Sequence, residues 1–416
     1  MAQRLQLSER EITVWYRAVL GLFFSSGLVT AALLTRLPDV AHGLGLSSGP
    51  MGMLLLGMTL GSFTAVSFSG AAVAKFGSRT CIAAAYAVTI VGMVLIGVGV
   101  HLSSFPLVLV GLIFQGLSSA ISNVASNVQG VSNERALGRY VTPIMHGFFS
   151  IGTVVGAAIG TLDTALGVPF MVHMFYFAAA VAFIVFFSLR KCHSESYGQD
   201  DTRALATVGT YRVRDAWRDK HTLLIGLFVM GMALAEGSAN DWVALALTHD
   251  YGTSSSVGSA GYFTFVAAMM VGRLAGTAFL NRYGRVKVLR VTCTLALGGL
   301  TLFIFAPNVP LGFVGLLIWG LGASLGFPTG MSAASDNPLK SAVRVSVVST
   351  IGYAAFLGGP PLLGLLGEHF GIRNGLLAVL IFVAVSLYLT RYLEPRKKPA
   401  VYTESLPVIR DIRTQD

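Results

Sequence analysis

The sequence predicts an all-α integral membrane protein with twelve transmembrane helices in two six-helix halves. Three observations support this fold class: about twelve apolar stretches of close to twenty residues, basic residues gathered on one side of those stretches, and a repeat between the halves. Each stretch can cross a hydrocarbon core of about 30 Å as a helix. A helix is expected because lipid offers no hydrogen-bond partners to an open backbone.

The expected spans, in chain order, are 14–35, 50–74, 80–101, 106–130, 141–163, 168–189, 221–246, 257–281, 286–306, 310–334, 341–366 and 371–393. The first span is too long for a signal-peptide core, so it is expected to stay uncleaved. The one long polar connection divides the chain. The expected domains are residues 1–190 as the N-terminal half, 191–220 as a cytoplasmic linker loop, 221–393 as the C-terminal half and 394–416 as a cytoplasmic tail.

Composition and charge agree with a membrane protein. Hydrophobic residues make up 54% of the chain and charged residues 12%, about half the charged share of a soluble domain. The net charge of +10 would suggest nucleic acid for a soluble protein, but basic loops here need only face anionic lipid. No nucleic-acid partner is therefore expected. The three cysteines map to the cytoplasmic half, so no disulfide is predicted.

The distribution of basic residues predicts how the chain lies in the membrane. If residue 1 is cytoplasmic and every stretch crosses, Arg36 and Arg373 fall outside and Arg273 lies within a span. The other 26 of the 29 basic residues are then cytoplasmic. This positive-inside pattern predicts a multi-pass protein of the inner (cytoplasmic) membrane with both termini in the cytoplasm.

The two halves repeat. The segment that begins at Gly21 (GLFF) matches the one at Gly226 (GLFV), and the segment at Gly111 (GLIFQGL) matches the one at Gly315 (GLLIWGL). Four such matches lie within three residues of a single offset. A parallel duplication of six-helix units is typical of a transporter whose halves rock around a central site.

At these motifs the chain resembles the major facilitator superfamily over nearly its whole length. The family's loop signature after span 2 is G-x-x-x-D-R-x-G-R, and residues 70–79 read GAAVAKFGSR, without the acid. The second copy, residues 281–285 (NRYGR), keeps the basic residues but has Asn for that acid. Further local matches resemble the MosC-like branch, related to fucose permeases: residues 36–38 (RLP), 127–129 (NVQ), 145–152 (MHGFFSIG), 236–242 (EGSANDW) and 352–361 (GYAAFLGGPP).

The resemblance implies that spans 1, 4, 7 and 10 line a central cavity. In span 4, Gln115, Ser119, Asn123 and Asn127 recur every four residues and so share one helix face. A polar face within hydrocarbon needs water, a ligand or another helix. We predict that Gln115, Asn123 and Asn127 bind substrate, with helix packing as the alternative.

Glu236 lies near the middle of span 7, where a charged carboxylate is costly. A carboxylate that takes up a proton there can carry it with the substrate, so Glu236 is predicted to couple transport to protons. The alternative is a permanent pair with Arg273 or a bond to Asn240. Arg273 could itself attract an anionic substrate, and its role stays open.

Arg36 and Asp241 are equivalent under the repeat, at the outer ends of spans 1 and 7. Opposite charges at equivalent outer helix ends predict an ion pair that acts as an external gate. This gate would close when the substrate site faces the cytoplasm. The alternative is two solvated charges of little energetic weight. Trp242 is predicted to contact substrate as a cavity lid, or else to anchor the helix at the interface.

His146 and Tyr353 are also equivalent under the repeat, in spans 5 and 11. Both can donate hydrogen bonds to a polar substrate, and histidine can exchange a proton near neutral pH. Both are predicted to bind substrate, with bonds to neighbouring helices as the alternative.

Nothing in the sequence predicts catalysis. It holds no Walker loop, no metal-ligand spacing and no nucleophile–base pair, so no enzyme activity, cofactor or metal is expected. The prediction is a secondary active transporter, proton-coupled, that moves a small polar or sugar-like solute by alternating access. Its expected partners are that solute, protons and membrane lipid, and a monomer is expected. The alternative within the class is proton-driven efflux of drugs or metabolites, although the drug antiporters' Gly-Pro pair in span 5 is absent. From a different class, the alternative is a non-transporting membrane receptor.

Overall fold

Helices account for nearly all of the regular structure in the computed structural model, which describes residues 8–137, 141–193, 213–336 and 340–394. Within these ranges there is no strand, and twelve helical segments are long and apolar enough to cross a membrane. The chain is therefore a multi-pass membrane protein, as predicted.

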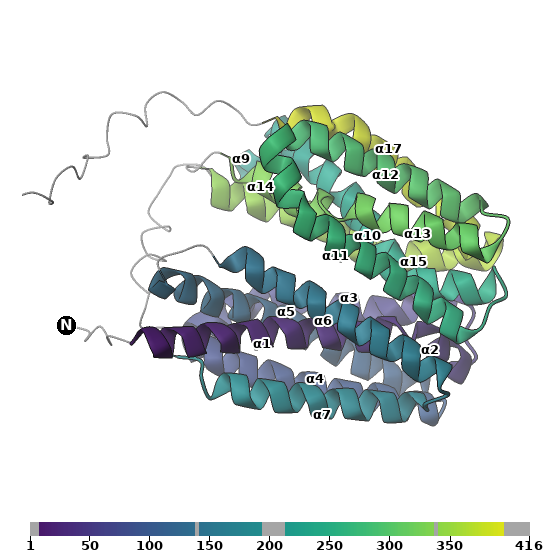
Figure 1. Cartoon of the computed structure of the whole chain (residues 1–416), viewed down its shortest axis with the longest axis horizontal. Coiled ribbons are helices and arrows are strands. Elements are labelled where there is room, and N and C mark those ends of the chain that lie inside the picture. Colours follow the sequence, from purple (N-terminus) through teal and green to yellow (C-terminus); the bar gives the residue numbers. More distant parts are fainter. Residues whose placement is uncertain (1–7, 138–140, 194–212, 337–339, 395–416) are drawn as a thin grey trace, which may run out of the picture.

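The helices form two groups, which lie one above the other in Figure 1. The first comprises α1 (Glu9–Leu34), α2 (Leu37–Leu44), α3 (Ser48–Phe76), α4 (Ser78–His101), α5 (Phe105–Leu137), α6 (Thr142–Ala165) and α7 (Phe170–Leu189). The second comprises α9 (Val213–Ala216), α10 (Lys220–His249), α11 (Ser255–Tyr283), α12 (Arg285–Phe305), α13 (Val309–Ala323), α14 (Gly326–Ala334), α15 (Ser341–Phe370), α16 (Ile372–Gly375), α17 (Leu377–Leu389) and the 3-10 helix η1 (Thr390–Leu393).

Two features of the helices depart from the predicted spans. The short helix α2 follows α1 after a break at Thr35 and Arg36, with Pro38 in its first turn, where a missing N–H costs nothing. The tenth span is divided into α13 and α14 at Ser324 and Leu325.

The repeat extends to the backbone at two tight turns. Gly77 joins α3 to α4 with φ 80° and ψ 150°, and Gly284 joins α11 to α12 with φ 80° and ψ 161°. A positive φ of this size favours glycine because other residues carry a Cβ that clashes. The two loop signatures therefore build the same turn in each group.

The groups meet mainly through two helix pairs, α3 on α15 and α6 on α11. We call the end where α1 begins, α7 ends and α10 begins the linker side, and the other end the opposite side. On the opposite side the Gly49 N–H donates to Glu368 Oε2 at 2.8 Å, and Ser259 Oγ donates to the Thr35 carbonyl at 2.8 Å. At Gly52 an added Cβ would lie 2.5 Å from the Pro360 carbonyl oxygen. The groups are therefore closed together on the opposite side.

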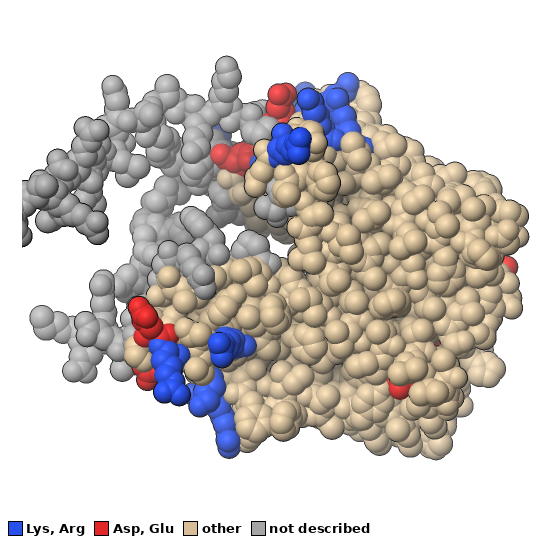
Figure 2. Space-filling view, in the orientation of Figure 1, with Lys and Arg blue, Asp and Glu red and all other residues tan. Residues whose placement is uncertain are grey.

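On the linker side the two groups separate, as Figure 1 shows, and the space-filling surface is hollowed between them (Figure 2). In the same view the Lys and Arg side chains gather on this side, while the rest of the visible surface holds few charges (Figure 2). Large apolar side chains are exposed on the spans, among them Phe183, Phe305 and Ile381. Such a surface suits hydrocarbon, where no water competes for apolar contact.

Candidate functional site

A central pocket of about 270 Å³ lies between the two groups. It is lined by α1, α3 and α5 of the first group and by α10 and α15 of the second. The lining residues are Val29, Thr30, Leu33, Leu34, Leu55, Met58, Thr59, Ser62, Phe63, Gln115, Gly116, Ser119, Gly237, Asn240, Asp241, Tyr353, Phe356 and Pro360. A pocket that both groups build changes shape whenever they move relative to each other.

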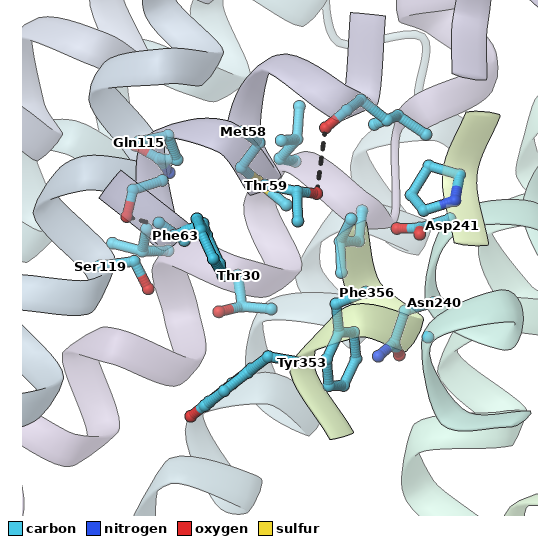
Figure 3. Close-up of a pocket in the computed structure, with 18 residues that line it drawn as sticks. Thr30, Met58, Thr59, Phe63, Gln115, Ser119, Asn240, Asp241, Tyr353 and Phe356 are labelled. Atoms are coloured by element: carbon cyan, nitrogen blue, oxygen red, sulfur yellow. Dashed lines mark hydrogen bonds between the residues drawn. The ribbon is translucent and has the colours of Figure 1, made fainter. Parts of the chain in front are cut away.

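The wall from the first group is uncharged, with five polar side chains among apolar ones (Figure 3). Its hydroxyl groups come from Thr30, Thr59, Ser62 and Ser119, and the Ser62 Oγ donates to the Gly116 carbonyl at 3.0 Å. Gln115 adds an amide, as predicted from the polar face of span 4. Both polar atoms of that amide are buried and have no hydrogen-bond partner among the described residues, a costly condition for a buried polar group.

The wall from the second group is aromatic and acidic. Asn240 and Asp241 come from α10, and Tyr353 and Phe356 from α15 (Figure 3). Tyr353 is 43% exposed, which agrees with its predicted place in the cavity. Asp241 is the one charged residue among the lining residues, and its carboxylate has no hydrogen bond or ion pair with any residue that the structure describes.

Glu236 lies on α10 but not in the pocket lining. Its carboxylate accepts from Arg273 Nη2 of α11 at 2.8 Å, and both side chains are mostly buried. Arg273 also donates through Nε to the Ser324 carbonyl at 3.3 Å, at the break between α13 and α14. The permanent pair that the sequence offered as an alternative is thus the geometry found here.

The predicted ion pair between Arg36 and Asp241 is not formed in this structure. Arg36 pairs with Asp39 and donates to the Val168 carbonyl at 2.9 Å, just before α7. The physical reason is the break after α1, which places Asp39 one helical turn from Arg36 in α2. On α10 the helix runs uninterrupted past Asp241, whose side chain faces the pocket instead.

Trp242, which was predicted to contact substrate, does not line the pocket in this structure. Its side chain is fully buried within the second group, and its indole N–H has no partner among the described residues. Consecutive helical residues point about 100° apart, so Asp241 faces the pocket while Trp242 does not.

Three further predicted residues lie outside the pocket lining. Asn123 and Asn127 follow Ser119 along α5 toward the linker side, and Asn127 Nδ2 donates to the Asn123 carbonyl at 2.8 Å and to its Oδ1 at 3.1 Å. His146 is exposed near the start of α6, edge-on to the Phe23 ring at 5.1 Å. These side chains lie between the pocket and the linker side.

The sequence reasoning missed several lining residues. Thr59, Ser62 and Phe63 come from α3, a span that the family resemblance did not place at the cavity. A signal was present, because Thr59 and Ser62 are three residues apart and share a helix face. Thr30 and Asn240 lie on spans that were expected to line the cavity, but neither was singled out as a lining residue.

A buried polar cluster at the opposite side of the first group was not predicted either. His173 is fully buried; its Nδ1 lies 2.6 Å from Asp163 Oδ2 and its Nε2 lies 3.0 Å from the Ala32 carbonyl. The Tyr176 hydroxyl donates to Asp163 as well. The cluster ties α1, α6 and α7 together and is separate from the pocket.

The sequence and fold match known transporters. The family model of the Major Facilitator Superfamily matches residues 19–343 and 242–414. An uncharacterized MFS-type transporter from Yersinia pestis is 30% identical over 368 residues, covering 88% of this chain and 92% of that protein. Membrane protein MosC from Rhizobium meliloti is 27% identical over 389 residues, covering 92% of each.

Solved structures agree on the fold. The nucleoside transporter NupG superposes with a TM-score of 0.70 at 16% identity, covering 91% of this chain and 98% of that one. The Escherichia coli fucose:proton symporter FucP superposes with a TM-score of 0.63 at 16% identity, covering 92% and 100%. The matched family, the relatives and the two-group fold around a central pocket agree, and the chain belongs to the Major Facilitator Superfamily of transporters.

Proposed function

We propose that this protein is a secondary active transporter that moves a small polar or sugar-like solute across the cytoplasmic membrane by alternating access, coupled to protons. The linker side faces the cytoplasm, and the protein acts as a monomer in lipid. The observation that carries the proposal is the central pocket, because each group supplies one of its walls. Rocking the groups would expose the same pocket to either side of the membrane.

The chemistry of the walls supports a polar, hydrogen-bonding solute. The first wall offers hydroxyl groups and the unpartnered amide of Gln115, and the second offers Asn240 and the rings of Tyr353 and Phe356. Buried polar groups of this kind gain most from a ligand that completes their hydrogen bonds. That a nucleoside transporter and a fucose:proton symporter share the fold is in keeping with this proposal.

Gln115 and Tyr353 are proposed to bind the solute within the pocket. Asn123, Asn127 and His146 are proposed to contact it on its way between the pocket and the linker side. The basic residues that gather on that side support its cytoplasmic orientation.

The test begins with thermal-shift screening of purified protein against sugars, polyols, nucleosides and organic acids, because a ligand that binds the folded state raises its melting temperature. Each ligand found is then followed as a radiolabelled solute into liposomes that hold the protein and an imposed pH gradient. Wild-type protein should accumulate at least one such solute. Absence of flux for every solute that binds would contradict transport and favour a receptor.

Tyr353→Ala locates the binding site. The solute should bind more weakly to this variant, because the Tyr353 side chain lines the pocket and makes no hydrogen bond with any residue that the structure describes. Tyr388→Ala is the matched control, since Tyr388 is 62% exposed on α17 and does not line the pocket. Equal affinity in both variants would place the site elsewhere.

A further inference from the structure

Among the described residues, two carboxylates lie in the interior of the spans, more than one helical turn from either end: Glu236 and Asp241, both on α10. We propose that Asp241, and not Glu236, is the carboxylate that takes up the coupled proton, and that the solute bound beside it is electrically neutral. The inference rests on the proposed function and names the residue that links proton to solute.

The first step is the difference in pairing. Arg273 lies 2.8 Å from Glu236, and the two charges cancel. Asp241 has no such partner among the described residues. A paired carboxylate in low dielectric gains from keeping its charge, whereas an unpaired one bears the full cost of desolvation unless it is neutralised.

The second step is location. Asp241 lines the pocket and Glu236 does not, so only Asp241 meets solute and pocket water directly. In the present state, open on the linker side, pocket water can solvate an ionised Asp241. When the groups close around a solute that displaces this water, the carboxylate needs a positive charge to remain in the membrane interior.

The third step is the source of that charge. No Lys, Arg or His is among the lining residues. Two arginines on elements packed against α10 already have partners: Arg36 pairs with Asp39 beside α2, and Arg373 of α16 donates to the carbonyls of Ile304 and Ala306. The other titratable groups near Asp241 are the phenols of Tyr262 on α11 and Tyr353 on α15, which are neutral at physiological pH.

The charge must therefore arrive from solution, and a proton supplies it when the solute is neutral. The proton moves from water to a carboxylate oxygen of Asp241 as the pocket closes, and returns to water when the pocket opens on the other side. Because the closed, loaded pocket favours protonated Asp241, solute movement and proton movement become one step.

The experiment compares Asp241→Asn with Glu236→Gln in liposomes, using a solute that wild-type protein accumulates. An amide mimics the protonated acid, so Asp241→Asn should lose pH-driven accumulation and solute-induced proton flux, both to the level of empty liposomes. It should still exchange labelled for unlabelled solute at equal pH. Glu236→Gln should retain pH-driven accumulation per folded molecule, with folded protein measured by size-exclusion chromatography and thermal unfolding.

The outcomes separate the inference from the function on which it rests. Normal pH-driven accumulation by Asp241→Asn would overturn the inference and leave transport intact. So would loss of accumulation in Glu236→Gln with its exchange preserved, because coupling would then belong to Glu236. If Asp241→Asn instead loses all binding and the accumulated solute is a cationic amine, Asp241 pairs with the solute and not with a proton. Absence of solute flux in wild-type protein would reject the proposed function itself.

Discussion

The two six-helix groups share a fold but place their charges differently. In the first group buried ionisable side chains pair near the opposite side, as Arg36 with Asp39 and His173 with Asp163. The second group, besides pairs on the linker side, has a pair in the middle of α10 and α11, Glu236 with Arg273, with the unpaired Asp241 nearby. The first group therefore supplies an uncharged wall to the pocket, and the second supplies its charge.

Arg36 and Asp241 show how the difference arises from a common position. The two residues are equivalent under the repeat, but α1 stops beside Arg36 while α10 continues through Asp241. The break turns Arg36 toward Asp39 and the Val168 carbonyl. The unbroken helix keeps Asp241 on the face that meets the pocket. Duplication thus preserved the backbone plan while local breaks changed what equivalent residues contact.

The largest effect is expected from substitutions at equivalent glycines, where the helices of both groups pack closely. A Cβ added at Gly116 would lie 1.8 Å from the Met58 carbonyl oxygen, and one at Gly320 would lie 2.5 Å from the Phe265 carbonyl oxygen. Neither backbone can yield without moving a helix. Gly116→Ala and Gly320→Ala should each lower stability by about 3 kcal/mol or more, with the greater loss of folded protein at Gly116.

The matched controls are Gly70→Ala and Gly298→Ala, one in each group, where an added Cβ meets nothing within 4 Å. Fluorescence-detected size exclusion measures the folded fraction of all four variants. Controls as damaged as the test variants would show that glycine flexibility, and not close packing, decides the outcome.

The next largest effect is expected from breaking the Glu236–Arg273 pair in the middle of the second group. Removing Arg273 leaves Glu236 charged and unpaired in the membrane interior, so Arg273→Ala should lower stability by about 3 kcal/mol. The double variant Arg273→Ala with Glu236→Gln should recover much of this loss, because no lone charge remains. Thermal unfolding in detergent measures both. A double variant no more stable than Arg273→Ala would mean that packing of the arginine stem dominates.

A smaller effect concerns how the groups hold together on the opposite side. Glu368 of α15 accepts from the Gly49 N–H at the start of α3, and this contact, not an Arg36–Asp241 pair, joins the groups there. Glu368→Gln weakens the acceptor and should shift the population toward states that are open on the opposite side. A cysteine placed at pocket residue Thr30 should then react faster with a membrane-impermeant thiol reagent added from that side.

The control for this measurement is Glu9→Gln, an exposed acid at the start of α1 with no contact between groups. The native cysteines of the chain are buried and should contribute little background labelling. An unchanged labelling rate in Glu368→Gln would show that the glycine contact between α3 and α15 closes this side without help from the carboxylate.

The spans were predictable because each needs only length and apolar composition, which lipid imposes on any membrane helix. The family resemblance and the period of four in span 4 likewise placed Gln115 in the pocket. Helix rotation was harder to predict, since Asp241 and Trp242 are neighbours in sequence but only Asp241 faces the pocket. It was harder still to predict that Arg273 pairs with Glu236 and leaves Asp241 without an ion pair among the described residues.

The partner of Arg36 was not predicted because α1 ends just before this residue. The repeat correctly aligned it with Asp241, but a match in sequence position carries no information about local breaks. Pro38 was the available signal, because proline is favoured in the first turn of a new helix. A helix that begins there brings Asp39 within reach of Arg36, and a partner one turn away in the same segment costs less to order than one in the other group.

The smallest expected effect concerns Asp219, which lies outside the spans and caps the start of α10. Burial alone would raise the pKa of its carboxyl, but hydrogen bonds from the Thr222 hydroxyl and the His221 N–H, together with the Arg344 charge 3.6 Å away, hold that pKa below its ordinary value. A lowered pKa means that the folded state favours the ionised form. The stabilisation is therefore complete above the ordinary value of 3.8 and is lost as the pH falls through the lower folded value.

Asp219→Asn keeps a capping side chain but removes the charge, so at neutral pH it should lower stability by only about 0.5 kcal/mol. The difference from wild type should be constant between about pH 5 and pH 8, and should shrink below about pH 4, where the unfolded carboxyl takes up its proton. Thermal unfolding of both proteins across this range measures it. Glu394→Gln, at an exposed position after η1, serves as the control for a general loss of negative charge. A difference that instead grows on acidification would mean that Asp219 is held protonated in the folded state, and that α10 begins without a charged cap, contrary to the contacts around its first turn.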